Sequence, residues 1–147
     1  MSHSPLVAVV ILNWNGKKHL EKFLPSVVAS TYAPLKIIVA DNASTDDSVP
    51  FLKQHFPQVS LIVLEQNFGF AKGYNEALKN VEADYLVLLN SDVEVTLGWL
   101  RPLRDLLEAS PRIAAVQPQV IERPHVRPEA LPDRQPELRL VDLRPGR

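Results

Sequence analysis

The sequence predicts an α/β domain with a mostly parallel sheet and flanking helices. Short apolar segments rich in β-branched residues alternate along the chain with segments whose apolar residues recur at helical spacing. The loops between them are short and polar. This alternation is typical of strand–helix–strand units, in which right-handed crossovers place the strands in parallel. The 147 residues are enough for one such domain with its own core.

The first part of the chain is expected to contain two strands, each followed by a helix. Residues 6–12 form a continuous apolar run, as expected of a strand buried on both faces. Apolar residues in 20–28 then recur at helical spacing. Residues 35–40 are the second strand, and the polar loop 41–45 is expected to cap a helix near residues 46–56.

The next part of the chain repeats the pattern. We expect a third strand over residues 59–64, a helical face over 70–81, and a fourth buried strand over 85–89. A short alternating segment, 93–95, follows, and four leucines between 100 and 107 predict another amphipathic helix.

The last part of the chain changes in composition. Residues 113–121 are expected to form the last strand, at an edge of the sheet because Pro118 cannot donate to a ladder. Prolines recur from Pro124 to Pro136 among Arg, Glu and Leu, which excludes a helix interior or a central strand. We therefore expect a domain over residues 1–122 and an extended or disordered tail over 123–147.

Composition excludes several functions. The 16 basic and 17 acidic side chains nearly balance, so the chain lacks the positive charge that nucleic-acid binding requires. Cysteine is absent, which excludes disulfides and thiolate metal sites and favours the cytoplasm. The longest apolar run, 5–14, is shorter than the roughly 20 residues that span a bilayer.

Polar loops follow the first four strands. They are Asn13-Trp14-Asn15, Asp41-Asn42, Asn67-Phe68-Gly69 and Asn90-Ser91-Asp92. Ligands of parallel α/β sheets bind beyond the carboxyl ends of the strands, so these loops are expected to converge on one site.

Two carboxylates stand out in these loops. Asp41 could accept hydrogen bonds from a base or a ribose, although an Asp here often caps a helix or orders its own loop. Asp92 suits a hard divalent cation that also takes phosphate oxygens, although it could equally be a turn-forming residue.

The third loop opens a helix that contains two glycines, Gly69 and Gly73, which would let the backbone approach a ligand. Lys72 is more often a solvated surface lysine than a phosphate ligand. Trp14 either stacks on a base or packs beneath a helix. The chain has neither a P-loop nor a GxGxxG fingerprint, which argues against a standard nucleotide hydrolase or dehydrogenase.

Four ordered motifs together resemble glycosyltransferase family 2, in particular its rhamnosyltransferase-like branch. They are Val9-Val10-Ile11-Leu12-Asn13-Trp14-Asn15-Gly16, residues 39–48, residues 67–75 and Leu88-Leu89-Asn90-Ser91-Asp92. The resemblance covers roughly residues 6–121. It implies the Rossmann-like nucleotide-diphospho-sugar transferase fold, known as glycosyltransferase A.

The resemblance also implies site residues. Asp41 would contact the base of a UDP- or dTDP-sugar, and Asp92 would bind Mg²⁺ or Mn²⁺. Asn90 replaces the first acid of the family's DxD pattern, which leaves fewer anionic ligands. The nucleotide-sugar-binding residues implied are Asn13, Trp14, Asn15, Asp41, Asn42, Asn67, Gly69, Gly73, Asn75, Asn90 and Ser91.

The implied reaction is the inverting, metal-assisted transfer of a sugar to a saccharide or lipid-linked acceptor, in the cytoplasm or at the inner face of the membrane. Glu94, Glu108 and Glu122 are available carboxylates, but no pattern nominates one as the base. The family's acceptor-binding half lies downstream of the metal motif. We therefore expect this chain to be a truncated donor-binding half whose residues 123–147 are not family sequence.

Two further expectations follow. An incomplete domain would expose apolar surface, which predicts a homodimer or poor solubility. The main alternative function is a non-catalytic nucleotide-sugar-binding module. A nucleotidyltransferase is a third, but such enzymes usually carry a glycine-rich, basic loop after the first strand, unlike residues 13–17.

Overall fold

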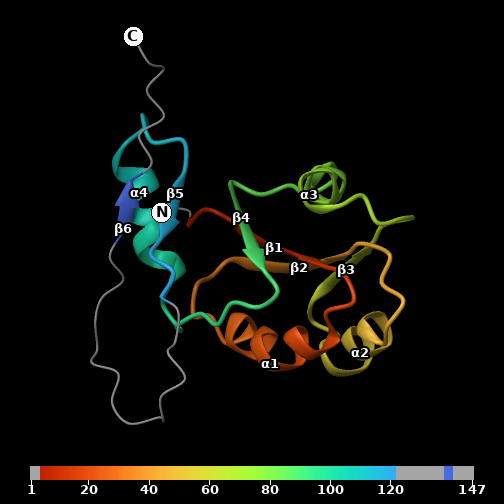
Figure 1. Cartoon of the computed structure of the whole chain (residues 1–147). Helices are drawn as coiled ribbons and strands as arrows, with labels where there is room; N and C mark the ends of the chain where they lie inside the picture. Colours follow the sequence, from red (N-terminus) through yellow and green to blue (C-terminus); the bar gives the residue numbers. More distant parts are fainter. Residues whose placement is uncertain (1–3, 122–137, 141–147) are drawn as a thin grey trace. The chain divides into compact units, whose positions relative to one another are not determined.

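A computed structural model describes residues 4–121 and 138–140 of the chain. The chain forms two compact units, Met1–Leu97 and Gly98–Arg147 (Figure 1). The first unit contains the four loops that the sequence singles out.

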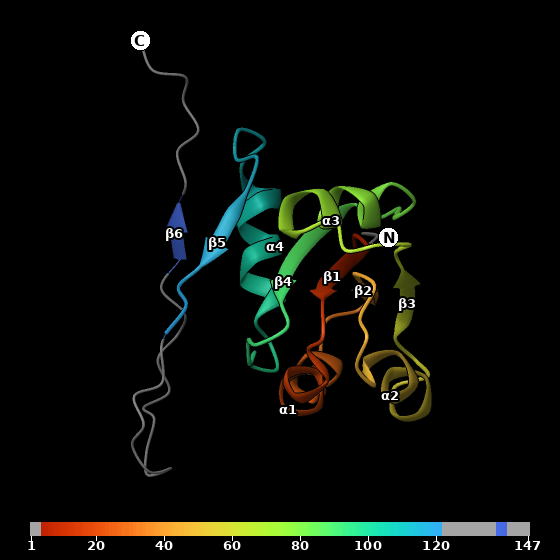
Figure 2. The ribbon, with the colours of Figure 1, turned by 45° about the vertical axis from the view of Figure 1, so that its right-hand side comes forward.

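The first unit is built on a four-stranded sheet with the order β3-β2-β1-β4 (Figure 2). All three pairs of neighbouring strands are parallel, as the sequence predicts. In chain order the elements are β1 (Val7–Asn13), α1 (Lys17–Val28), β2 (Leu35–Asp41), α2 (Ser48–His55), β3 (Ser60–Val63), α3 (Phe70–Leu78) and β4 (Tyr85–Asn90). Strands β1, β2 and β4 therefore end within the predicted polar loops, and β3 ends four residues before the third loop begins at Asn67.

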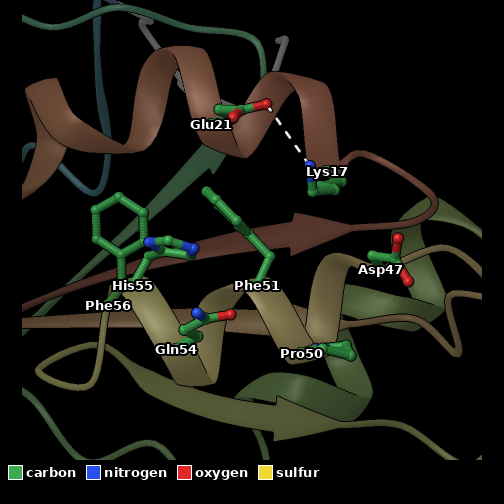
Figure 3. Close-up of a pocket in the computed structure, with 8 residues that line it drawn as sticks. All are labelled: Lys17, Glu21, Asp47, Pro50, Phe51, Gln54, His55 and Phe56. Carbon is green, nitrogen blue, oxygen red and sulfur yellow. Dashed lines mark ion pairs between the residues drawn. The ribbon is translucent and has the colours of Figure 1, made fainter.

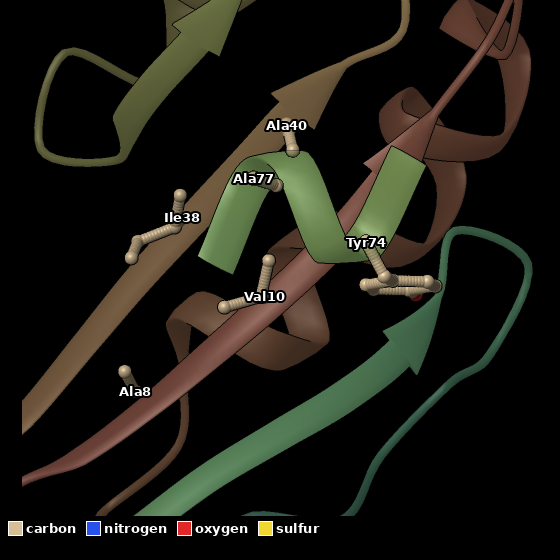
Figure 4. Close-up of a cluster of buried hydrophobic side chains, with 6 residues drawn as sticks. All are labelled: Ala8, Val10, Ile38, Ala40, Tyr74 and Ala77. Atoms are coloured by element: carbon tan, nitrogen blue, oxygen red, sulfur yellow. The ribbon is translucent and has the colours of Figure 1, made fainter. Parts of the chain in front are cut away.

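Helices cover both faces of this sheet. Helix α3 lies on one face, and α1 and α2 lie on the other (Figure 1). Strand β1 is the centre of the core because every residue from Val7 to Ile11 is buried. Beneath α3, alternate residues of β1 and β2 pack against the helix (Figure 4). The buried members of this cluster are Ala8, Val10, Ile38, Ala40, Tyr74 and Ala77.

Strand β4 is not buried on both faces, contrary to the sequence prediction. Leu86 and Leu88 are 48% and 55% exposed. In register they lie beside Ala8 and Val10, on the face that α3 covers. Helix α3 packs against β1 and β2 and leaves the leucines of the edge strand open. Apolar content alone could not distinguish this edge position from a central one.

The start of α2 also differs from the prediction. No side chain of loop 41–45 caps the helix; instead Oδ1 of Asp46 accepts a 3.0 Å hydrogen bond from the Ser48 amide. Oδ2 of Asp46 accepts a 3.1 Å bond from the Lys17 amide, in the first turn of α1. One carboxylate therefore caps two helices, because loop geometry brings both N-termini to it.

The second unit contains α4 (Leu100–Ala109), β5 (Val116–Pro118) and β6 (Leu138–Leu140). The predicted amphipathic helix is confirmed, with Leu100 and Leu103 buried. The predicted last strand is wrong in extent and partner: only three residues of 113–121 form β5, which pairs antiparallel with β6 rather than joining the parallel sheet. Strand β6 lies in the expected tail, of which residues 123–137 and 141–147 lie outside the described residues.

None of the helices in the described part of the chain is long and apolar enough to cross a membrane. The segment 93–95 forms neither a helix nor a strand.

Candidate functional site

The carboxyl ends of β1 and β2 are joined by a buried pair of side chains. Nδ2 of Asn13 donates a hydrogen bond of 2.9 Å to Oδ2 of Asp41 and one of 3.2 Å to Oγ of Ser44. Oδ1 of Asp41 accepts a 2.8 Å bond from the Ser44 amide. Asp41 therefore orders its own loop, one of the two roles that the sequence left open, and it also holds the first loop.

Asn15 forms a second link between these loops. Its backbone adopts a left-handed conformation with φ of 50°. Its Oδ1 accepts hydrogen bonds from the amides of Thr45, at 2.7 Å, and Asp46, at 3.2 Å. Its own amide donates to Oγ of Ser44 at 2.8 Å. Asn15 thus fixes the second loop, which sequence reasoning could not foresee because the partners lie about thirty positions away in the chain.

The pKa of Asp46 reflects this arrangement. Partial burial raises the pKa, but the hydrogen bonds donated by Ser48 and Lys17 outweigh it, so the pKa lies below its usual 3.8. The carboxylate is ionised at neutral pH and carries negative charge at two helix N-termini, where it is favourable.

The third loop is held by Asn42, which is 2% exposed. Its Nδ2 donates to Oδ1 of Asn67 at 2.9 Å and to the Gly69 carbonyl at 3.0 Å. Its Oδ1 accepts a 3.0 Å bond from the Phe68 amide. A side-chain amide can donate two hydrogen bonds and accept two, and three of these four bonds of Asn42 are made with residues of the third loop.

The two glycines of the third motif have different physical roles. Gly69 has φ of +75°, a conformation that L side chains rarely adopt, and it precedes the first residue of α3. Gly73 lies within α3, where an added Cβ would come 3.0 Å from a methyl of Leu12 and 3.1 Å from Nδ2 of Asn42. The structure therefore places Gly73 at a close contact between helix and strand.

The fourth loop follows β4 at the same edge of the sheet. Asn90 lies beside Leu12 in register, and Ser91 is near Gly16 of the first loop. Asn90 and Asp92 are exposed and Ser91 is half-buried. All four loops thus meet at one edge, as the strand order requires once the strands are parallel.

The oxygen atoms of the fourth loop are hard ligands, which suit Mg²⁺ or Mn²⁺. Among residues 4–121, however, no group of three or more His, Asp or Glu side chains is close enough to hold a metal ion. Magnesium is commonly bound by one or two carboxylates together with substrate phosphates and water. The donor set around Asp92 fits a metal that arrives with a diphosphate, and does not fit a cage made of protein alone.

Aromatic and exposed groups line the rim of these loops. Trp14 is 58% exposed, so it does not pack beneath a helix. Asn67 and Asn75 are also exposed. Nζ of Lys72 lies 4.7 Å from the centre of the Phe68 ring, a cation–π contact on the helix surface. The rim therefore offers a tryptophan, amides and a lysine to a ligand.

A groove that the sequence did not predict lies between α1 and α2 (Figure 3). Its volume is about 610 Å³. It is lined by Lys17, Glu21, Asp47, Pro50, Phe51, Gln54, His55 and Phe56. None of the residues expected to bind a nucleotide sugar lines it, so the candidate site remains the carboxyl edge of the sheet.

Comparison with known proteins agrees with the motifs. The family model for glycosyl transferase family 2 matches residues 8–142, beyond residue 121, where we expected the resemblance to stop. An N-acetylglucosaminyl-diphospho-decaprenol L-rhamnosyltransferase of Mycobacterium tuberculosis is 27% identical over an alignment of 126 residues, and the match covers 78% of this chain. The chain spans 41% of the length of that relative.

Solved structures show the same fold. Staphylococcus aureus TarS, residues 1–349, in complex with UDP-GlcNAc matches 86% of this chain and 36% of its own, at 21% identity and a TM-score of 0.63. The mannosyltransferase PcManGT of Pyrobaculum calidifontis, in complex with GDP-Man and Mn²⁺, matches 76% of this chain and 34% of its own, at 24% identity and a TM-score of 0.59. The chain has the glycosyltransferase A fold and belongs to glycosyl transferase family 2.

Proposed function

We propose that this chain is the donor-binding part of an inverting, metal-assisted glycosyltransferase that uses a UDP- or dTDP-sugar. The observation that carries the proposal is the buried network in which Asn13, Asp41 and Asn42 hold three loops together at the carboxyl edge of the sheet. These three side chains are buried and polar, and they hold loop residues in place by hydrogen bonds instead of adding apolar contacts to the core. A rigid set of loops is what a nucleotide site needs.

We assign binding of the donor's nucleotide base to the first three loops. Both oxygens of Asp41 already accept hydrogen bonds, and each retains a lone pair for a base imide. Asp41 is only 1% exposed, so it forms the floor of the site. Exposed Trp14 and Asn67 at the rim would contact the base and ribose by stacking and hydrogen bonding.

The diphosphate is assigned to the fourth loop. Asp92, assisted by Asn90 and Ser91, would hold Mg²⁺ or Mn²⁺ only together with the donor's phosphates, since the chain supplies one carboxylate there. The bound metal would supply Lewis-acid stabilisation of the departing diphosphate. The complex of PcManGT with GDP-Man and Mn²⁺ supports the use of a divalent metal in this fold.

We expect the acceptor to bind outside the candidate site. We infer a saccharide or lipid-linked acceptor, cytoplasmic or at the inner face of the membrane, from the mycobacterial relative, whose name includes a diphospho-decaprenol. The carboxylate that deprotonates the acceptor is not assigned: Glu94 and Glu108 are exposed, and Glu122 lies outside the described residues. The chain spans 41% of that relative, so these statements concern the whole enzyme.

Isothermal titration of the full chain with UDP, dTDP and GDP, each with Mn²⁺ or EDTA, tests the proposal. We expect UDP or dTDP to bind, more tightly with Mn²⁺, and GDP to bind weakly. A donor-hydrolysis assay then tests for turnover. Binding without turnover would favour the alternative, a nucleotide-sugar-binding module, and no binding of any nucleotide would refute both.

The exposed leucines of β4 support a second proposal, that the isolated chain self-associates. Size-exclusion chromatography over a range of concentrations tests it. A clean monomer at high concentration would refute it.

A further inference from the structure

The hydroxyl of Tyr74 lies between β1 and β4 close to where both strands end. It donates a hydrogen bond of 2.9 Å to the carbonyl of Leu89 and accepts one of 3.4 Å from the amide of Leu12. Leu89 immediately precedes the Asn90-Ser91-Asp92 turn. A side chain of α3 thus contacts the backbone of β4 at the last residue before the candidate metal turn.

The environment of Tyr74 makes this contact well defined. The side chain is 4% exposed and packs in the cluster beneath α3 (Figure 4). Its ring also meets Phe70 edge-to-face, with 5.1 Å between the centroids. Burial raises the pKa of the hydroxyl above its usual 10.0, so it stays protonated and can donate to Leu89.

The neighbouring residue strengthens the link. Gly73 brings the backbone of α3 against the side chain of Leu12, while Tyr74 contacts the amide of the same leucine. Helix α3 begins directly after the third loop. Helix α3 therefore connects the third loop to the fourth loop, and Tyr74 makes the contact at the fourth loop.

We propose that Tyr74 is a positioning residue whose hydroxyl sets the conformation of the Asn90-Ser91-Asp92 turn for a metal-bound diphosphate. The proposal rests on the proposed function of this turn. Edge strands are the least constrained part of a sheet, and β4 has a strand partner only on its β1 side in the described sheet. The link from α3 adds a hydrogen bond to β4 at the residue before the turn.

The alternative role for Tyr74 is packing alone. The substitution Tyr74→Phe distinguishes the two, because it keeps the ring in the cluster and removes the hydroxyl. Tyr32→Phe is a matched control. Tyr32 is 7% exposed, and its hydroxyl donates a 2.7 Å bond to the carbonyl of Pro5. Pro5 precedes β1, at the amino ends of the strands and away from the candidate site.

Two measurements on the full chain test the proposal. Amide hydrogen exchange of the peptide covering residues 88–93 is expected to accelerate about fivefold in Tyr74→Phe, as for the loss of one hydrogen bond. The same peptide is expected to be unchanged in Tyr32→Phe. In calorimetry, Tyr74→Phe is expected to reduce the gain in UDP affinity that Mn²⁺ provides, while UDP binding in EDTA stays as in the original chain.

The outcomes separate this proposal from the proposed function. Unchanged exchange of residues 88–93 in Tyr74→Phe, or equal acceleration in both variants, would overturn the role of Tyr74. Accelerated exchange with an intact effect of Mn²⁺ would also overturn it, since the turn would move without consequence for the diphosphate. If the original chain binds no UDP, the proposed function fails. The role of Tyr74 in positioning a metal-bound diphosphate then fails as well, even where accelerated exchange shows that Tyr74 holds the turn.

Discussion

The side-chain amide of Asn13 donates a 2.9 Å hydrogen bond to the carboxylate of Asp41, and the two side chains are 0% and 1% exposed. The residues end β1 and β2 and lie side by side in register. A buried carboxylate loses its hydration and needs donors in return. Asn13 supplies one, so the fold and the candidate site depend on the same bond.

Replacing Asp41 with Ala tests this dependence. The substitution removes the acceptor of the Ser44 backbone amide and one of the two acceptors of the Asn13 side-chain amide, which keeps its bond to Oγ of Ser44. We expect the free energy of unfolding to fall by about 2–3 kcal/mol, measured by urea denaturation. Glu82→Ala, at an exposed position, is the control and should cost no more than about 0.5 kcal/mol. Equal losses would show that the pair contributes little.

Gly16→Ala should disturb the same pair from the other side. An added Cβ would collide with Oδ1 of Asn13, which is itself buried without a hydrogen-bond partner. We expect a loss of about 1–3 kcal/mol in unfolding free energy from overpacking. Gly98→Ala is the matched control, because a Cβ there meets no atom within 4 Å. A stable Gly16→Ala variant would contradict the close approach.

Asn42→Ala should loosen the third loop. It removes the donor to Asn67 and Gly69 and the acceptor for Phe68. Amide exchange across residues 66–70 should accelerate roughly tenfold or more, as for the loss of more than one hydrogen bond. Asn80→Ala, in an exposed turn, should leave this exchange unchanged. Similar exchange in the two variants would show that Asn42 does not hold the loop.

The caps made by Asp46 predict a pH dependence. Because its pKa is lowered in the folded chain, its contribution to stability is fully present above the unfolded value of 3.8 and is lost as pH falls through the folded pKa. Asp46→Asn should therefore be less stable than the original chain at pH 6, and the difference should be smaller at an acid pH below 3.8. Urea denaturation at both pH values measures it, with Asp47→Asn, which makes no side-chain cap, as control. A difference independent of pH would contradict the assignment.

The fourth loop predicts opposite effects for two substitutions. Asp92→Asn removes its carboxylate and should abolish the gain in UDP affinity from Mn²⁺. Asn90→Asp adds a second carboxylate beside the first and should increase that gain about tenfold, because hard cations bind more tightly as anionic ligands are added. Titrations in EDTA should show neither change. If both variants respond to Mn²⁺ like the original chain, the metal lies elsewhere.

Much of the fold could be predicted from the sequence. The β-branched run of β1 and the helical spacing of α1, α3 and α4 are local patterns, and each gave the right element within a few residues. The convergence of four loops also followed, because parallel strands must all end at the same edge.

Several features needed the tertiary structure. Asn13, Asn15 and Asn42 could be recognised as polar residues at strand ends, but their partners lie 25 or more positions away in the chain. Tyr74 was expected only as part of an apolar helical face, because its hydroxyl has no role until β1 and β4 lie beside α3.

The sequence by itself determined where the strands and helices of the first unit form, which of its strands are parallel and which loops meet, because these depend on local periodicity and connection length. Only the tertiary structure decided that Leu86 and Leu88 are exposed, that β5 pairs with β6, and which donor faces each buried acceptor. Hydrogen bonds and burial depend on distances between segments remote in the chain, and residue types alone do not specify those distances.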